Sequence, residues 1–168
     1  MTLAHFLDLN RVQITSYHTE GGKYNSNESE PWCASFANYS LLKGNSDYPR
    51  TSSPASSSFY LKATQMQLEQ VDEPYYGSIM VRSNNGKFTG GTGHVAFVVG
   101  KEGDAFAQLG GNQAVPGSSE GTTVNVVLRE QTNTVRYYHF LFLPKVPLGD
   151  SLFEPATKEA ETQLGTDR

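Results

Sequence analysis

The stretch SEPWCASFANYSLLKG, residues 29–44, carries the strongest structural signal in the chain. The residues at its start can cap a helix, Pro31 suits the first turn of a helix, and Gly44 suits the position after the last turn. Its apolar side chains recur every three to four residues, which is the spacing of one buried helix face. The pattern predicts a helix that begins near Pro31 and carries Cys33 in its first turn.

Outside this helix, the sequence predicts loops, one further helix and a sheet. Residues 18–30 are rich in glycine and asparagine and are predicted to be a loop, whereas a partial apolar stripe predicts a second helix over 58–70. Short segments rich in β-branched and aromatic residues follow, separated by turns, at 78–82, 94–101, 104–109, 122–130 and 135–143. Their close spacing predicts an antiparallel sheet of about five strands.

Length and composition predict a single α+β domain. The chain has 168 residues, of which 37% are hydrophobic and 18% are charged, which is enough apolar material for one core. We expect the domain to span 1–148 and the polar residues 149–168 to form a tail. The net charge of -4 argues against nucleic acid or an anionic membrane surface as a partner.

Cysteine and histidine usage excludes two further classes of site. Cys33 is the only cysteine, so no disulfide can form within the chain, and the four histidines have no zinc-ligand spacing. We therefore expect no metal ion or other cofactor, and we also expect a monomer.

The N-terminal sequence lacks the pattern of a secretory signal, and no run of 18 apolar residues occurs, so we expect synthesis in the cytoplasm.

Cys33 is the first candidate for chemistry. The first turn of a helix favours an anion, because its backbone N–H groups are unpaired and the helix dipole is positive there. The position predicts a thiol with a depressed pKa, as a nucleophile needs. The alternative is a buried structural cysteine, since free cysteine is among the most buried residue types.

His94 and the segment LGGNQ, residues 109–113, are the next candidates. His94 opens an apolar strand directly behind the glycine-rich residues 90–93, where a substrate backbone could approach the imidazole. The amide of Asn112 or Gln113 could accept a hydrogen bond from the imidazole and fix its tautomer. The alternatives are a solvent-facing or capping histidine and an ordinary Gly-Gly-Asn turn.

Taken in order, these motifs resemble a known family. PWCASF at 31–36, GSIMV at 77–81, GHVAFVVG at 93–100 and LGGNQ at 109–113 look like the consecutive motifs of the NlpC-type and CHAP-type cell-wall peptidases and amidases. A helix-borne cysteine, a strand-borne histidine and a polar amide one strand later are also the order of a papain-like triad. The resemblance covers about residues 20–143.

The resemblance implies a papain-like fold and a cysteine hydrolase that cleaves an amide bond of peptidoglycan. In such an enzyme Cys33 is the nucleophile, His94 the general base and acid, and Asn112 the residue that orients the imidazole, with Gln113 as the alternative. The fold places the helix that carries the nucleophile against an antiparallel sheet.

Aromatic residues near the nucleophile have candidate roles as well. Tyr17 or Tyr24 could supply a side-chain donor to the oxyanion, and Trp32 could line the cleft, although each of the three could equally be a packing residue.

The sequence also departs from the family. Ser78 stands where relatives commonly carry Asp, and the loop before His94 is longer. These departures leave the substrate preference open. Arg82 and Lys87 are the basic residues nearest that loop and could contact a substrate carboxylate, or could be ordinary surface cations.

The leading hypothesis is therefore a peptidoglycan hydrolase. It would act in the periplasm of a target bacterium as an injected antibacterial effector, similar to type VI secretion amidases and with a cognate immunity protein as partner, or on the host cell wall as a phage lysin. Two alternatives stay open. One is a noncatalytic binding module with the same fold, and the other is a thiol acyltransferase or protein deamidase.

Overall fold

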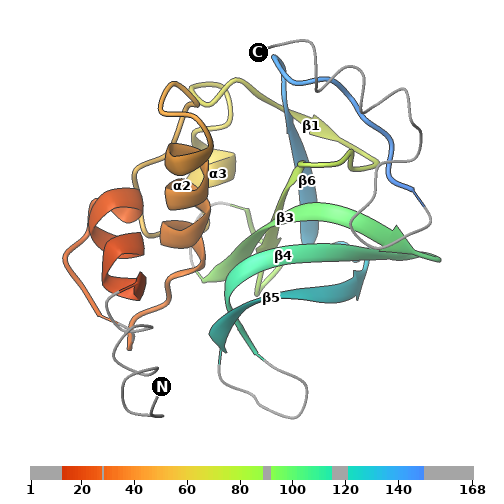
Figure 1. Cartoon of the computed structure of the whole chain (residues 1–168). Coiled ribbons are helices and arrows are strands. Elements are labelled where there is room, and N and C mark those ends of the chain that lie inside the picture. The colour runs from red at the N-terminus through yellow and green to blue at the C-terminus, as the bar shows by residue number, and fades with distance from the viewer. Residues whose placement is uncertain (1–12, 28, 89–91, 115–120, 150–168) are drawn as a thin grey trace, which may run out of the picture.

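Six strands form one antiparallel sheet in the computed structural model, which describes residues 13–27, 29–88, 92–114 and 121–149 (Figure 1). The predicted tail at 149–168 lies outside the described residues except for its first position. The elements in chain order are η1 (Tyr17–Gly22), α2 (Cys33–Gly44), α3 (Ser58–Leu61), β1 (Leu68–Val71), β2 (Ile79–Ser83), β3 (Gly93–Glu102), β4 (Ala105–Ala114), β5 (Gly121–Glu130) and β6 (Val135–Phe140).

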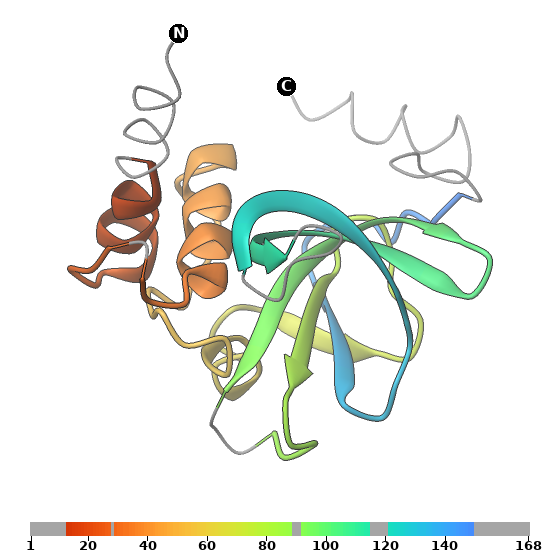
Figure 2. The ribbon, with the colours of Figure 1, turned by 90° about the horizontal axis from the view of Figure 1, so that it is seen from below.

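The strand order across the sheet is β1-β6-β2-β3-β4-β5, and every neighbouring pair is antiparallel. The predicted α+β class and the antiparallel sheet are thereby confirmed. Figure 2 shows η1 and α2 together on one side of the molecule, while β5 begins beside α2 and curves in a long arc over the rest of the sheet. No helix among the described residues is long and apolar enough to cross a bilayer.

The helix predicted to carry Cys33 in its first turn is confirmed as α2. It begins at Cys33, with Trp32 as its N-cap residue, and it contacts η1, β3 and β4. The buried amide of Asn38 holds the following loop against it, because Asn38 Nδ2 donates to the Thr51 hydroxyl at 2.9 Å and Oδ1 accepts from the Thr51 amide at 2.9 Å. The helix and the loop after it are therefore tied together by a satisfied buried polar group.

The helix predicted over 58–70 is wrong for most of its length. Only Ser58–Leu61 is helical, and Leu68–Val71 forms the edge strand β1. Gln67 lies between them with a φ of 54°, a left-handed conformation that ends any helix. Pairing of Leu68 with Phe140 of β6 buries Leu68 and stabilises the strand, whereas the partial apolar stripe offered a helix little buried surface.

The loop predicted over 18–30 is wrong at its start, because Tyr17–Gly22 is a short π-helix. Its glycines allow close packing against α2: a Cβ at Gly21 would lie 2.6 Å from the backbone nitrogen of Tyr39, and one at Gly22 would lie 2.5 Å from the Ser35 hydroxyl. In the sequence these two glycines indicate a loop, but in the structure they allow η1 to pack closely against α2.

Apolar clusters on the two faces of the sheet form the core. One joins the buried face of α2 to β2 and β3 and contains Cys33, Val81 and Val95. The other includes Met80 and Ala96, the next positions along the same strands. Because side chains alternate between the faces of a strand, each strand contributes to both clusters. The thiol of Cys33 thus belongs to the helix-facing side of the sheet.

Candidate active site

Cys33 lies where α2 meets β3. It is the first residue of α2, its side chain is 3% exposed, and the backbone N–H of Val95 donates a hydrogen bond to its thiol. Val95 directly follows His94 in the chain. The structure therefore brings Cys33 and His94 to the same end of β3, but the thiol packs with Val95 on the helix-facing side of the sheet, whereas the His94 side chain points to the opposite face.

The predicted depression of the thiol pKa is wrong. Burial raises the pKa of Cys33 above its ordinary value, although hydrogen bonds from the backbone N–H groups of Val95 and of the helix start, together with the positive charge of Arg82, oppose the rise. The helix terminus does favour the thiolate, as expected, but removing the sulfur from water disfavours the charged form by more.

His94 is the second residue of β3, pairs with Arg82 of β2, and is 7% exposed. Burial lowers its pKa to about 4, with the nearby charges of Arg82 and Arg129 acting in the same direction and a side-chain hydrogen bond with Gln113 opposing them. The imidazole is therefore neutral at pH 7. Its buried Nε2 has no hydrogen-bond partner of standard geometry.

The glycine before His94 serves the sheet rather than a substrate. A Cβ at Gly93 would collide with the carbonyl oxygen of Arg82 on the neighbouring strand. The expectation that this glycine leaves room for a substrate backbone is therefore wrong at Gly93, and residues 90 and 91 lie outside the described part of the chain.

Gln113 presents its amide oxygen to His94. Its Nε2 donates to the backbone carbonyls of Gln108 at 3.1 Å, Gly110 at 3.2 Å and Asn125 at 2.7 Å, which fixes the orientation of the amide group. The buried Oε1 has no other partner and can only accept. Of the two amides considered from the sequence, the one that contacts the imidazole is that of Gln113.

A β-bulge in β4 explains why Gln113 and not Asn112 takes this position. The pairing of β4 with β5 shifts between Gly110 and Gln113, and Asn112 has a φ of 57°. Asparagine tolerates this left-handed conformation better than most residues. The extra residue turns the Gln113 side chain back toward His94, while Asn112 is partly exposed.

The glycines of LGGNQ have a packing role. A Cβ at Gly111 would lie 2.5 Å from the Trp32 ring and 2.6 Å from the Phe36 Cβ, so α2 can approach β4 only because residue 111 is glycine. The predicted strand over 104–109 therefore continues through the motif to Ala114, and the predicted Gly-Gly-Asn turn is wrong. The same motif positions α2, which carries Cys33, and the Gln113 amide beside His94.

The aromatic candidates are placed as packing residues. Trp32 is 2% exposed and stacks on Tyr17 at 5.6 Å between ring centroids, and Tyr17 also packs edge-on against Phe36 at 5.3 Å. Tyr24 is 43% exposed and its ring contacts His18. Trp32 therefore belongs to the interior rather than to an open cleft.

Ser78, which departs from the family pattern, holds a turn. Its hydroxyl accepts a hydrogen bond from the Tyr75 backbone N–H at 2.9 Å and lies 3.1 Å from His139 Nδ1. A serine thus satisfies the turn and the buried histidine together.

Sequence reasoning missed two buried polar groups near the site. His18 is fully buried and its Nδ1 lies 3.0 Å from the hydroxyl of Ser35 on α2, so it fastens η1 to the helix of the nucleophile. Gln108 is also fully buried, and neither amide atom has a partner. The presence of only four histidines in the chain could have drawn attention to His18. No pattern in the sequence marks Gln108.

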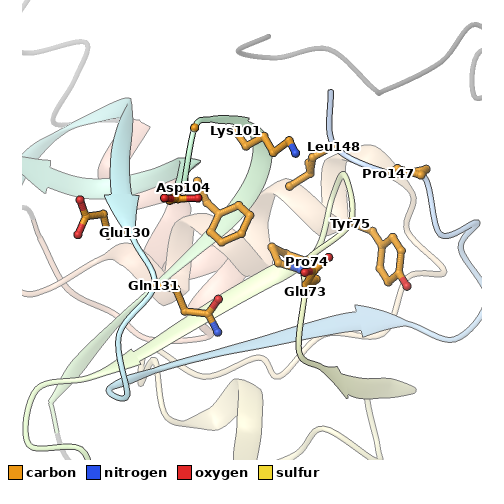
Figure 3. A pocket seen from close by; sticks show the side chains of 11 residues that line it. Glu73, Pro74, Tyr75, Lys101, Asp104, Glu130, Gln131, Pro147 and Leu148 are labelled. Carbon is orange, nitrogen blue, oxygen red and sulfur yellow. The ribbon is translucent and has the colours of Figure 1, made fainter. Parts of the chain in front are cut away.

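A cavity of about 620 Å³ lies away from the thiol, beside the turn between β3 and β4 (Figure 3). Its lining side chains include Glu73, Lys101, Asp104 and Glu130, and Figure 3 shows them gathered from several strands and loops. This turn is at the opposite end of β3 from His94, so the cavity is separate from the candidate active site.

The described residues contain no group of three His, Cys, Asp or Glu side chains that could hold a metal ion. Comparison with protein-family models, with curated proteins and with solved structures finds no match for this chain.

Proposed function

We propose that this chain is a papain-like cysteine hydrolase that cleaves an amide bond in the peptide part of peptidoglycan. The observation that carries the proposal is that α2 holds the Cys33 thiol on the Val95 backbone amide, at the end of β3 that also carries His94, while the His94 imidazole contacts the Gln113 amide of β4. The peptidoglycan substrate follows from the resemblance of the four motifs to cell-wall hydrolases.

In the proposed reaction the neutral imidazole of His94 turns toward the thiol at the end of β3 and takes its proton as the sulfur attacks the amide carbonyl carbon. The resulting oxyanion lies at the N-terminus of α2, where backbone N–H groups are available to stabilise it. His94 then gives the proton to the leaving amine as the C–N bond breaks. Water hydrolyses the thioester with His94 again as the base, and the thiol is restored.

Gln113 acts in this scheme as a positioning residue. Its Oε1 accepts a hydrogen bond from one imidazole N–H and leaves the other ring nitrogen unprotonated for the thiol. Because its Nε2 is held by three backbone carbonyls, the amide cannot turn to present a donor instead. Gln113 therefore takes the role that the sequence assigned first to Asn112.

Mass spectrometry of muropeptides tests the proposal directly. Purified Gram-negative peptidoglycan is incubated with the wild type, with Cys33→Ala and with Cys33→Ser, which nearly preserves the shape of the side chain. We expect new fragments with the wild type alone, and their masses identify the bond that is cut. Equal fragments from Cys33→Ala would exclude the thiol as nucleophile.

A noncatalytic binding module is the second candidate, and the burial of the Cys33 side chain favours it. Pull-down of intact peptidoglycan separates the two. A binding module retains the polymer without releasing fragments, and Cys33→Ala leaves that retention unchanged.

A thiol acyltransferase or deamidase would instead form a thioester with another acyl donor, which intact-mass measurement detects as an adduct on Cys33.

The proposed place of action is the periplasm of a target bacterium, reached by injection, with phage-mediated lysis of the host wall as the alternative. Expression tests it. An injected effector is toxic when fused to a periplasmic signal and harmless in the cytoplasm, and a cognate immunity protein restores growth. Toxicity that needs a co-expressed holin indicates a phage lysin.

A further inference from the structure

A second cavity, of about 410 Å³, lies behind His94 on the face of the sheet opposite α2. Its lining comes from β2, β4, β5, the turn before β6 and the start of β6, and it includes Arg82, Gln108, Arg129 and Glu130. Arg82 and His94 are directly paired across β2 and β3, so their side chains share this face. Arg129 is paired with Phe106, which packs against the apolar cluster of the same face.

Two arginines, Arg82 and Arg129, line this cavity, and among the described residues neither has a carboxylate partner. Burial lowers the pKa of Arg82, and the positive charge of Arg129 lowers it further. The Nε atoms of both side chains are buried and have no hydrogen-bond partner. Within the described residues the ion pairs are Lys43–Glu20 and Lys145–Glu69, and neither involves these arginines. Glu130 also lines the cavity, but its side chain is exposed.

Gln108 is an independent sign of a missing ligand. Its side chain is fully buried, it lines the cavity, and neither Nε2 nor Oε1 has a hydrogen-bond partner. An unpaired buried amide is costly, because it loses its hydrogen bonds to water, so such groups are rare unless something binds them. Its Nε2 can donate to the same anion that two arginines would attract.

We infer that this cavity binds a carboxylate group of the substrate, with Arg82 and Arg129 as its ion-pair partners and Gln108 as a hydrogen-bond donor. The inference deepens the proposed function, because the peptide stems of peptidoglycan carry free carboxylates. A guanidinium matches a carboxylate through paired N–H groups, and two of them compensate the loss of water around the anion.

Carboxylate binding also bears on the base. Arg82 on β2 and Arg129 on β5 both disfavour the imidazolium of His94, whereas Gln113 on β4 favours it. A bound carboxylate neutralises part of that positive field and raises the pKa of His94 from about 4. The imidazole becomes a stronger base when a substrate with the correct charge is present, which couples recognition to catalysis.

The test measures binding without turnover, on ¹⁵N-labelled Cys33→Ala protein. N-acetyl-D-alanine supplies the carboxylate, and N-acetyl-D-alaninamide is the same molecule without its charge. We expect the carboxylate to shift the side-chain NMR signals of Arg82, Arg129 and Gln108, and the amide to bind at least tenfold more weakly. Arg129→Gln should weaken binding of the carboxylate by tenfold or more. Arg136→Gln, which removes an arginine of β6 outside the cavity lining, should leave it unchanged.

Three results would overturn the inference: equal binding of the acid and its amide, unchanged affinity in Arg129→Gln, or no shift with either molecule at millimolar concentration. Inorganic phosphate is tested in parallel. Shifts with phosphate but not with N-acetyl-D-alanine would indicate a site for a free anion and would overturn the substrate role. If the carboxylate binds but peptidoglycan is not cleaved, the proposed hydrolase fails and the anion site stands.

Discussion

Gln113 contacts His94 with an amide whose orientation is fixed by three backbone carbonyls. The contact depends on the bulge at Asn112, because a regular strand would place the Asn112 side chain there instead. The adjacent amides of Asn112 and Gln113 thus have different positions relative to His94. This difference allows a matched comparison.

Gln113→Ala should lower kcat by about 100-fold, because loss of the amide that orients a catalytic histidine typically costs between about 10²- and 10⁴-fold. Asn112→Ala should change kcat by less than about fivefold, since its side chain is partly exposed and does not contact His94. Steady-state kinetics on isolated muropeptides measure both variants. Gln113→Glu separates positioning from structure: a carboxylate still accepts from the imidazole, and it should raise the pKa of His94 in an NMR titration. A larger loss of kcat in Asn112→Ala than in Gln113→Ala would reverse the assignment.

The raised pKa of Cys33 predicts slow alkylation at neutral pH. The reactive thiolate forms only as pH rises through the pKa, so the rate of reaction with iodoacetamide should have its midpoint above the ordinary value of 9.0. Arg82→Gln should move the midpoint further up, because the charge of Arg82 favours the thiolate. Protein unfolded in urea provides the reference for an unperturbed thiol. A midpoint below that of the unfolded protein would show that the helix terminus outweighs burial.

Local sequence signals were sufficient for α2 and for the position of Cys33. Proline, glycine and a regular apolar spacing act within one element, so they need no tertiary partner. The edge strand β1 was not predictable in the same way. Leu68–Val71 is extended because it pairs with β6, about seventy residues later in the chain. This pairing outweighs the weak helical pattern of the local sequence.

The candidate site was predictable as a set of residue types but not as a set of contacts. The motifs indicated Cys33 and His94, and the structure brings them to one end of β3. The selection of Gln113 depends on a bulge, and the burial that raises the thiol pKa depends on how α2 packs. Arg129 had no local signal at all, because its effect on the pKa of His94 depends on how β3, β4 and β5 pair in the sheet.

His94 should make folding sensitive to mild acid. Its pKa is about 4 in the folded protein, below the ordinary value of 6.5, so the unfolded chain binds the proton more tightly. Stability is therefore full above pH 6.5 and falls as pH drops from 6.5 to 4, by about 3 kcal/mol from this group. Urea unfolding of the wild type and of His94→Gln at several pH values measures it. The variant should lose this part of the pH dependence, and identical slopes for both proteins would contradict the assignment.

Gly111→Ala should destabilise the protein although it adds a single methyl group. The new Cβ would lie 2.5 Å from the Trp32 ring and 2.6 Å from the Phe36 Cβ, so α2 would have to move away from β4. Overpacking of this kind costs about 1–3 kcal/mol. Gly44→Ala is the matched control, because no heavy atom lies within 4 Å of a Cβ built at Gly44. Urea denaturation of both variants gives the difference. Since α2 carries Cys33 and β4 carries Gln113, Gly111→Ala should also lower kcat, and an unchanged free energy of unfolding with unchanged kcat would show that α2 and β4 do not pack as described.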